Sequence, residues 1–206
     1  MSYRRIVPVI VAACFGMFLT AAFAEEAAKT TLENLQAAYN GESNAKARYD
    51  AFAAKADEEG YQQVASLFRA AARSESFHAR NHADVIKKMG AEPKADVKSP
   101  EVKSTRENVE TALKGEDYER DTMYPAFIEQ AEADKNNDAV ETFQEAKAAE
   151  TQHAKYYKEA LENLDNWKTG TKDFLVCTNC GYTTTDLSIQ KCPICAFPRE
   201  KIELVK

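Results

Sequence analysis

Two glutamate–histidine pairs in this chain have the spacing of metal ligands. The pairs are Glu75-x-x-His78 and Glu150-x-x-His153, and residues three apart on a helix project from one face. Each pair can therefore give a metal ion one carboxylate oxygen and one imidazole nitrogen. One further glutamate from each of two other helices would complete the ligand set of a dimetal site inside a four-helix bundle.

Two single glutamates, each after a glycine, fit that requirement. They stand in Asn40-Gly41-Glu42 and Lys114-Gly115-Glu116. The helical region therefore contains a twofold repeat. Glu75 follows Glu42 by 33 residues, and Glu150 follows Glu116 by 34. We expect Glu75 and Glu150 to bridge two metal ions. Glu42 and Glu116 are expected to be terminal ligands.

The alternative for each of these glutamates is an ordinary place on a solvated helix face. The chain has only 3 histidines, so a glutamate three positions before two of them is an infrequent coincidence. Burying four carboxylates without cations would cost many kcal/mol. Oxygen-rich ligation with two imidazoles suits iron or manganese better than a thiolate-seeking metal.

Glu119 breaks the repeat, since the corresponding position in the first half is Ala45. It lies three residues after Glu116 on the same helix face and is expected to be a fifth glutamate at the site. A spare carboxylate would let one metal ion exchange neutral His78 for anionic Glu119 as its charge rises. The alternative is a capping or surface glutamate.

Three more side chains lie close to these residues in the sequence. Tyr49 lies two turns after Glu42, and Tyr124 lies five residues after Glu119. Both tyrosines are candidate hydrogen-bond donors to the site, although aromatic residues at helical spacing are more often plain core. His82 has no glutamate three residues before it and is predicted to be structural or exposed.

The C-terminal tail carries two cysteine pairs, Cys177-x-x-Cys180 and Cys192-Pro193-x-Cys195, separated by 11 residues. Such pairs are typical of a tetrahedral thiolate metal site. Zinc, or disulfides in an oxidising compartment, are the alternatives. Spacing alone does not distinguish zinc from iron, and the neighbouring dimetal set favours one iron ion in this site.

The elements that must position these residues are long helices. Residues 30–165 are rich in strong helix formers, with breaks at Glu59-Gly60, from Met89 to Pro100, and at Lys135-Asn136-Asn137. Four helices of nearly thirty residues follow. The first and last breaks are short, which predicts antiparallel neighbours, and Ala91 to Pro100 is long enough to cross the bundle. The predicted fold class is all-α, a four-helix bundle followed by a small four-cysteine metal domain.

The N-terminus has the pattern of an export signal. Arg4 and Arg5 precede an apolar run from Ile6 to Phe23, and Ala22-Phe23-Ala24 precedes acidic residues. We expect cleavage after Ala24 and a periplasmic or otherwise exported protein. A retained membrane anchor, or lipidation at Cys14, is the alternative.

The predicted organisation is a signal peptide at 1–24, a bundle at 25–166, a linker at 167–172 and a cysteine domain at 173–206. The whole chain has a net charge of −6, from 27 basic and 33 acidic residues. Loss of the two signal arginines leaves 25 basic against 33 acidic residues, or −8. An acidic surface argues against nucleic acid as a partner.

Together these motifs resemble rubrerythrin, a ferritin-like di-iron domain fused to a rubredoxin-like domain, over about Leu32 to Ile202. The intervening Thr183 to Lys191 departs from the family, because it has no Gly or Pro where the family's loop usually turns. Export is a second departure, since family members are usually cytoplasmic. The resemblance implies a carboxylate-bridged di-iron site with ligands Glu42, Glu75, His78, Glu116, Glu119, Glu150 and His153, site tyrosines Tyr49 and Tyr124, and one iron bound by Cys177, Cys180, Cys192 and Cys195.

The activity implied by the resemblance is reduction of hydrogen peroxide to water. The di-iron pair would give two electrons, and one iron would exchange His78 for Glu119 as a ligand. The iron of the four-cysteine site would then reduce the pair again, with electrons from an unidentified redox donor. A ferritin-type iron-oxidising or sequestering protein and a pure electron carrier are the alternatives. Storage does not require the cysteine tail.

The chain length between the two centres predicts where electrons move. The twelve residues from His153 to Asp165 span about 18 Å as a helix at about 1.5 Å per residue, so we expect a chain's own cysteine centre to lie beyond one end of its bundle. A head-to-tail homodimer, as in the family, would place each tail beside the partner's di-iron site. Transfer between chains follows as a hypothesis.

Overall fold

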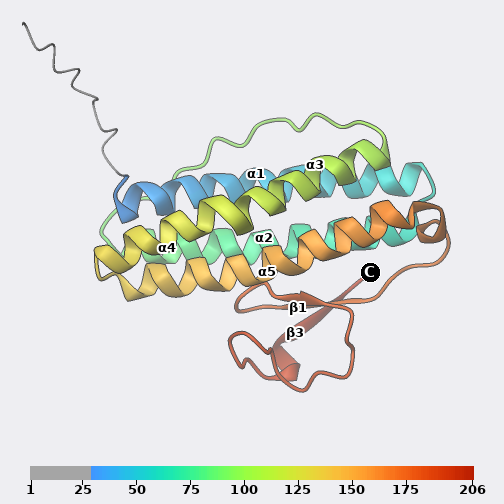
Figure 1. The fold of residues 1–206 in the computed structure, drawn as a ribbon. Coiled ribbons are helices and arrows are strands. Elements are labelled where there is room, and N and C mark those ends of the chain that lie inside the picture. Colours follow the sequence, from blue (N-terminus) through green and yellow to red (C-terminus); the bar gives the residue numbers. More distant parts are fainter. Residues whose placement is uncertain (1–28) are drawn as a thin grey trace, which may run out of the picture.

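The computed structural model describes residues 29–206, so the predicted signal peptide and Cys14 lie outside the described residues. Residues 31–162 form four antiparallel helical rods (Figure 1). No helix in residues 29–206 is long and apolar enough to span a membrane. The rods consist of α1 (Thr31–Glu58), α2 (Gln62–Lys88), α3 (Thr105–Tyr118) continued by the π-helix η1 (Glu119–Met123) and α4 (Tyr124–Ala133), and α5 (Asn137–Glu162).

Local sequence sets where these helices start. Thr30 and Ser104 are N-caps of α1 and α3, and each forms a reciprocal capping box with a glutamate three residues later, Glu33 or Glu107. Asn136 caps α5 by accepting a hydrogen bond from a backbone N–H. Asn136 falls at a predicted break and Thr30 at the start of the predicted helical region, whereas Ser104 lies four residues after the predicted break ends at Pro100.

The predicted crossover, Ala91 to Pro100, lies within an irregular segment, residues 91–104, that runs along α1 and α3 (Figure 1). Side-chain oxygens spaced four residues apart on α1 accept its backbone N–H groups, which fixes an otherwise irregular strap on the surface. The pairs are Gln36 with Lys94 at 3.0 Å, Asn40 with Asp96 at 2.8 Å, and Asn44 with Lys98 at 2.9 Å.

The third rod differs from the uninterrupted helix that the sequence predicts, because it contains a π-helix. Within η1 the backbone N–H of Tyr124 donates to the carbonyl of Glu119, five residues back. Pro125 follows directly and has no N–H to donate to the preceding turn, which favours a local departure from the α-helical ladder. Such wide turns are frequent at functional sites, and this one joins Glu119 to Tyr124.

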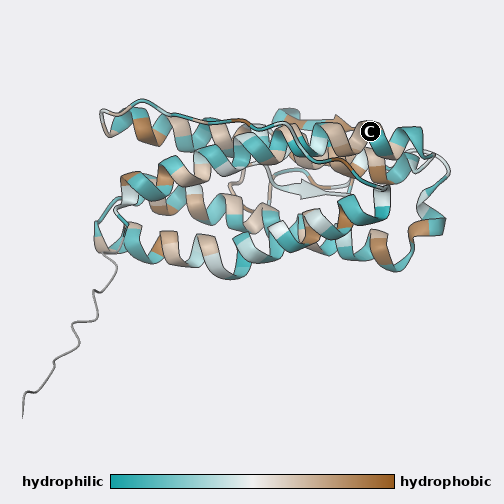
Figure 2. Cartoon of the chain, turned by 90° about the horizontal axis from the view of Figure 1, so that it is seen from above, coloured by the Kyte–Doolittle hydropathy of each residue, from teal (hydrophilic) through white to brown (hydrophobic). Residues whose placement is uncertain are grey.

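The bundle core consists of two apolar clusters with a polar layer between them. One cluster is centred on Phe52 and Phe68, and the other on Phe143 and Ile86. Viewed from above, the outward faces of the helices are predominantly hydrophilic (Figure 2). The buried glutamates and histidines therefore lie in the middle of the bundle, shielded from water at both ends.

The cysteine domain holds a small antiparallel sheet of order β2-β1-β3. Its strands are β1 (Phe174–Cys177), β2 (Thr183–Thr184) and β3 (Ile202–Val205). Val176 pairs with Thr183, and Cys177 pairs with Ile202. Two short 3-10 helices, η2 (Leu164–Trp167) and η3 (Arg199–Lys201), precede the sheet and its last strand.

The linker turns back toward the bundle, so the expectation that a chain's own cysteine centre lies beyond one end of its helices is wrong. Gly170 adopts φ +72°, a left-handed conformation suited to glycine. The side chains of Phe174 and Val176 on β1 then join the apolar cluster around Phe68. This burial holds the cysteine domain against α2 and α5, beneath the middle of the bundle (Figure 1).

Polar contacts from α2 complete this docking. Arg73 makes a bidentate ion pair with Glu203, with N–O distances of 2.7 and 2.8 Å. Arg80 donates to the carbonyl of Thr178 at 2.8 Å, and Asn81 donates to that of Asn179 at 2.7 Å. One helix thus carries both a run of ligand residues and the anchor points of the second domain.

Candidate metal centres

The structure brings six of the seven predicted bundle ligands together in the polar layer. They form two groups whose ligand atoms lie within 4.8 Å of one another. Both groups contain Glu75 and Glu150, the two carboxylates predicted to bridge. The first group is Glu42, Glu75, His78 and Glu150, and the second is Glu75, Glu116, Glu150 and His153.

Each shared carboxylate faces both imidazoles. Glu75 directs one oxygen to Nδ1 of His78 at 2.7 Å and the other to Nδ1 of His153 at 3.3 Å. Glu150 does the same, at 3.0 and 2.9 Å. This arrangement places two metal positions side by side, each with one imidazole nitrogen, and with both carboxylates between them.

The buried atoms of this layer fit two cations. The four carboxylates are 0–1% exposed, yet one or more oxygens of each find no hydrogen-bond partner among residues 29–206, and nor does Nδ1 of His153. Burial raises the pKa of Glu42 well above its usual value, and the charges of Glu75 and Glu150 raise it further. Burial and Glu150 also raise the pKa of Glu116 to about 8. Metal ions supply the positive charge that this layer otherwise lacks.

Both predicted tyrosines contact the terminal carboxylates. The Tyr49 hydroxyl donates to Glu116 Oε1 at 2.6 Å, and the Tyr124 hydroxyl donates to Glu42 Oε1. In each glutamate the other oxygen, Oε2, is the unpartnered one. The tyrosines therefore hold one oxygen of each terminal carboxylate and leave the second for a metal ion.

Tyr157 was not predicted and lies beside this layer. Its ring packs on those of Tyr49 and Phe68, at centroid distances of 5.8 and 5.4 Å, and its hydroxyl is buried without a hydrogen-bond partner among the described residues. It follows His153 by four residues, so the same helical spacing that singled out the ligands could have pointed to it.

Glu119 lies next to the site but belongs to neither ligand group. It is partly exposed and is the first residue of the π-helix. Its carboxyl group is nevertheless surrounded by protein, so burial raises its pKa well above the usual value, and the charges of Glu42 and Glu116 raise it further. In this structure His78 rather than Glu119 faces the bridging carboxylates, so the predicted exchange between them stays a prediction.

His82 is structural and fully buried, and it makes polar contacts at both ring nitrogens. Nδ1 lies 3.0 Å from the Thr142 hydroxyl, and Nε2 lies 3.2 Å from the Tyr124 hydroxyl. Burial lowers its pKa to about 3, so the ring is neutral. Sequence reasoning missed its contact with Tyr124, although His82 stands one helical turn after His78.

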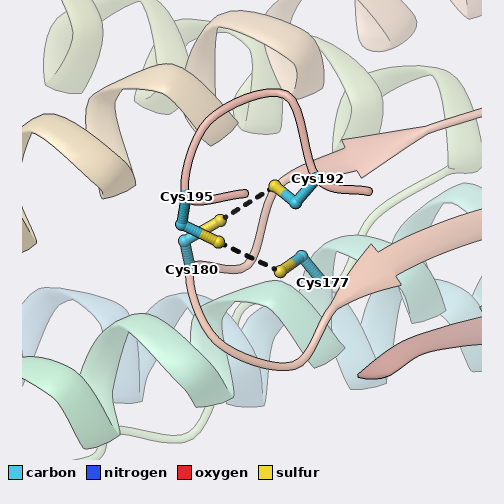
Figure 3. Close-up of side chains that lie close together, drawn as sticks. All are labelled: Cys177, Cys180, Cys192 and Cys195. Atoms are coloured by element: carbon cyan, nitrogen blue, oxygen red, sulfur yellow. Dashed lines mark hydrogen bonds between the residues drawn. The ribbon is translucent and has the colours of Figure 1, made fainter. Parts of the chain in front are cut away.

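The four predicted cysteines converge in the second domain (Figure 3). The sulfurs of Cys177 and Cys195 are 3.6 Å apart, and those of Cys180 and Cys192 are 3.5 Å apart. Four sulfurs at about 2.3 Å from a metal ion would lie about 3.8 Å from one another in a tetrahedron, whereas a disulfide requires about 2.05 Å. The geometry fits a single tetrahedral ion, and the four thiols are free.

The outer nitrogen of each ligand imidazole contacts the cysteine domain. Nε2 of His78 lies 3.2 Å from the carbonyl oxygen of Cys180, and Nε2 of His153 lies 3.1 Å from the Thr183 hydroxyl. Between them, Gly181 at φ +75° packs so closely that a Cβ there would lie 2.4 Å from Nε2 of His78. The peptide that follows a cysteine ligand of one centre thus touches a histidine ligand of the other.

Comparison with known proteins agrees with both halves of this geometry. The family model for rubrerythrin matches residues 33–161, and that for the rubrerythrin rubredoxin-like domain matches residues 176–203. The chain belongs to the rubrerythrin family. A nigerythrin from Nitratidesulfovibrio vulgaris is 39% identical over 186 residues, covering 89% of this chain and 90% of that protein. A rubrerythrin from Porphyromonas gingivalis is 32% identical over 180 residues, covering 85% and 90%.

The rubrerythrin fold extends over the whole described chain. The structure of the fully reduced, all-ferrous state of nigerythrin matches with a TM-score of 0.79 at 37% identity, covering 99% of this chain and 100% of that one. The predicted fold class, a ferritin-like bundle with a rubredoxin-like four-cysteine domain, is confirmed. The cofactors are a carboxylate-bridged di-iron site and one iron in a four-cysteine site. The exact domain bounds stay predictions.

Proposed function

We propose that this protein is a peroxidase that reduces hydrogen peroxide to water, with electrons relayed from the four-cysteine centre to the di-iron site. The contact between the Cys180 carbonyl and Nε2 of His78, at 3.2 Å, carries the proposal. A metal-storage protein has no need of a second redox centre in contact with its ligand histidine. Hydrogen peroxide takes up two electrons and two protons and gives two molecules of water.

The chain's own residues prepare the site for this reaction. When bound, the iron pair would supply two electrons at adjacent positions, and the cysteine-bound iron would replace them one at a time with electrons from the redox donor. Glu75 and Glu150 fix the spacing of those positions, while Tyr49 and Tyr124 orient the terminal carboxylates. The apolar clusters on either side exclude bulk water, which strengthens each of these contacts.

Stopped-flow mixing of the reduced, iron-loaded protein with peroxide tests the proposal. We expect oxidation of both centres, with peroxide outpacing dioxygen at equal concentration. A Cys177→Ala/Cys192→Ala variant is the matched control, since it should be oxidised once at the di-iron site and then stop. Faster reaction with dioxygen, with ferric iron accumulating in the protein, would select the ferroxidase or storage alternative. Slow oxidation by both would select an electron carrier.

The partners and location of this reaction are part of the proposal. Hydrogen peroxide is the substrate, and an unidentified redox protein supplies electrons in defence against oxidative stress. The N-terminal pattern of residues 1–24 supports export to the periplasm. Mass spectrometry of the mature protein tests this, since cleavage after Ala24 gives a chain that starts at Glu25.

A head-to-tail homodimer is also proposed, supported by the family resemblance alone. The contact between the two centres is made within one chain, so electron transfer does not require a partner chain in this arrangement. Sedimentation analysis at several concentrations tests the dimer. Turnover per chain that stays constant while a dimer dissociates would show that transfer occurs within one chain.

A further inference from the structure

Three buried side chains form a line of hydrogen bonds that reaches the di-iron layer. The Thr142 hydroxyl on α5 contacts Nδ1 of His82 on α2 at 3.0 Å, and Nε2 of His82 contacts the Tyr124 hydroxyl at 3.2 Å. Tyr124 in turn donates to Glu42. Tyr124 and His82 are fully buried, and Thr142 is 6% exposed.

The hydrogen bonds in this line all point the same way. A metal-bound carboxylate can only accept, so the Tyr124 proton points to Glu42. The Tyr124 oxygen then accepts from His82, which places the imidazole proton on Nε2. Nδ1 is left as an acceptor for the Thr142 hydroxyl proton. Each group therefore donates to the next, from Thr142 to the metal layer.

Thr142 is oriented differently from Thr111 and Thr151, two other threonines inside these helices. The hydroxyls of Thr111 and Thr151 donate to the carbonyl four residues back, at 2.8 and 2.9 Å, the usual arrangement within a helix. The Thr142 hydroxyl is directed across the bundle to His82. Thr142 also lines a surface pocket of about 230 Å³ together with Asp138, Glu141 and Glu145.

We propose that Thr142, His82 and Tyr124 form a proton relay from this surface pocket to the di-iron site. The inference rests on the proposed peroxidase function, because breaking the O–O bond of hydrogen peroxide with two electrons consumes two protons in a layer shielded from water. Glu145 in the pocket has its pKa raised to about 6 by burial and by Glu141, which suits a group that collects and releases protons near neutral pH.

The protons balance at each atom of the relay. The Tyr124 proton moves into the site as the Nε2 proton of His82 moves to the Tyr124 oxygen. The Thr142 proton moves to Nδ1, and the Glu145 carboxyl, through water in the pocket, returns a proton to the Thr142 oxygen and is itself reprotonated from bulk solvent. Rotation of the imidazole then carries its proton back to the Tyr124 side before the second proton passes. Two passages supply the two protons, the di-iron pair supplies the two electrons, and two waters leave.

Single-turnover and steady-state kinetics with peroxide test the relay on the iron-loaded protein. Thr142→Val keeps the side-chain shape and removes the hydroxyl, so kcat should fall at least about tenfold, with KM unchanged and an increased solvent deuterium isotope effect. Thr142→Ser should restore the rate. Thr151→Val is the matched control on the same helix and should behave as the wild type.

Nuclear magnetic resonance gives a readout independent of turnover. The chain has only 3 histidines, and zinc is diamagnetic and accepts the same imidazole and carboxylate ligands. In ¹⁵N-histidine-labelled, zinc-loaded protein, we expect His82 to be neutral with its proton on Nε2. Thr142→Val should move the Nδ1 resonance of His82 and leave those of His78 and His153 in place.

The outcomes separate the relay from the function on which it rests. A wild-type protein that does not reduce peroxide overturns both. Wild-type turnover that Thr142→Val retains, with an unchanged isotope effect, overturns the relay alone. A His82 proton on Nδ1 in the zinc-loaded protein also overturns it, because the line would then lack a donor toward Tyr124.

Discussion

The imidazole of His78 and the carbonyl of Cys180 bring a ligand residue of one metal centre into direct contact with a ligand residue of the other, with 3.2 Å between Nε2 and the carbonyl oxygen. Ser74, one turn before His78, donates to the next carbonyl, that of Gly181, at 2.7 Å. The Cys-Gly peptide is thus held at two successive carbonyls by one helix. The docking of the cysteine domain and the orientation of His78 depend on each other.

A side chain at Gly181 should separate the two centres. In Gly181→Ala the added Cβ would lie 2.4 Å from Nε2 of His78 and 2.6 Å from Oγ of Ser74, so the peptide must move away. We expect both centres to bind iron, while transfer from the cysteine-bound iron to the di-iron site slows at least about tenfold, because small displacements of reacting groups have large effects on rate. The absorbance of the cysteine-bound iron after a peroxide pulse follows this transfer.

Gly90→Ala is the matched control for this prediction. Gly90 has a similar φ of +80°, so alanine there carries the same backbone strain, but its Cβ would meet open space. Both variants should lose similar stability, and only Gly181→Ala should lose transfer. Equal transfer rates in the two would show that the close approach to His78 has no part in electron flow.

The Thr183 hydroxyl should support metal binding at His153. It donates to the Gly181 carbonyl at 3.0 Å and accepts from Nε2 of His153, which leaves Nδ1 free for the metal ion. Thr183→Val should weaken ferrous binding to the bundle by about tenfold or more, the usual effect of removing such a contact. Titration of iron-free protein measures this, with Thr183→Ser expected to retain the wild-type affinity.

The ligand layer could be predicted from the sequence because the spacing of residues within each helix determines which side chains share a face. Glu75 and His78 share a helix face by geometry alone, and four buried carboxylates can only be explained by cations. His82 shows where this reasoning stops, because its two partners come from other helices, Tyr124 after a π-helix and Thr142 from α5. Nothing local to His82 encodes those contacts.

The position of the cysteine domain was predicted wrongly for a related reason. Helix length fixes the distance from His153 to Asp165, but not the direction of the chain after Trp167. A left-handed turn at Gly170 and the burial of Phe174 and Val176 on the bundle set that direction. These are tertiary contacts, and the spacing of residues along the chain does not reveal which apolar side chains will be buried together.

Glu119 provides a test of ligand exchange. Glu119→Ala should leave both ferrous ions bound, because the six residues of the two ligand groups remain, but the oxidised site loses an anionic ligand that would offset its added charge. We expect slower turnover with peroxide at unchanged iron stoichiometry. Glu110→Ala, an exposed glutamate on α3, is the control, and identical rates in the two variants would assign Glu119 to the surface.

Removal of iron should make the stability of the bundle fall with rising pH. In the metal-free layer, burial and Glu150 raise the pKa of Glu116 from 4.5 to about 8, so between these values the folded state holds a proton that the unfolded state has released. The stabilisation is fully present below pH 4.5 and is lost as pH rises toward 8. His153 acts in the same sense, because Glu116 and Glu75 raise its pKa despite the opposing effect of burial. Glu150 has its pKa lowered by His78 and His153 against the effect of burial, and its contribution to stability is constant above pH 4.5.

Thermal unfolding of iron-free protein should therefore show a melting temperature that decreases from pH 5 to pH 8. Iron-loaded protein, whose ligands are ionised and paired with metal, should show a much flatter profile. Glu116→Gln carries no titrating group at this position, so its iron-free form should lose less stability over the same range. An iron-free wild-type protein that gains stability toward pH 8 would contradict the view that uncompensated carboxylates dominate this layer.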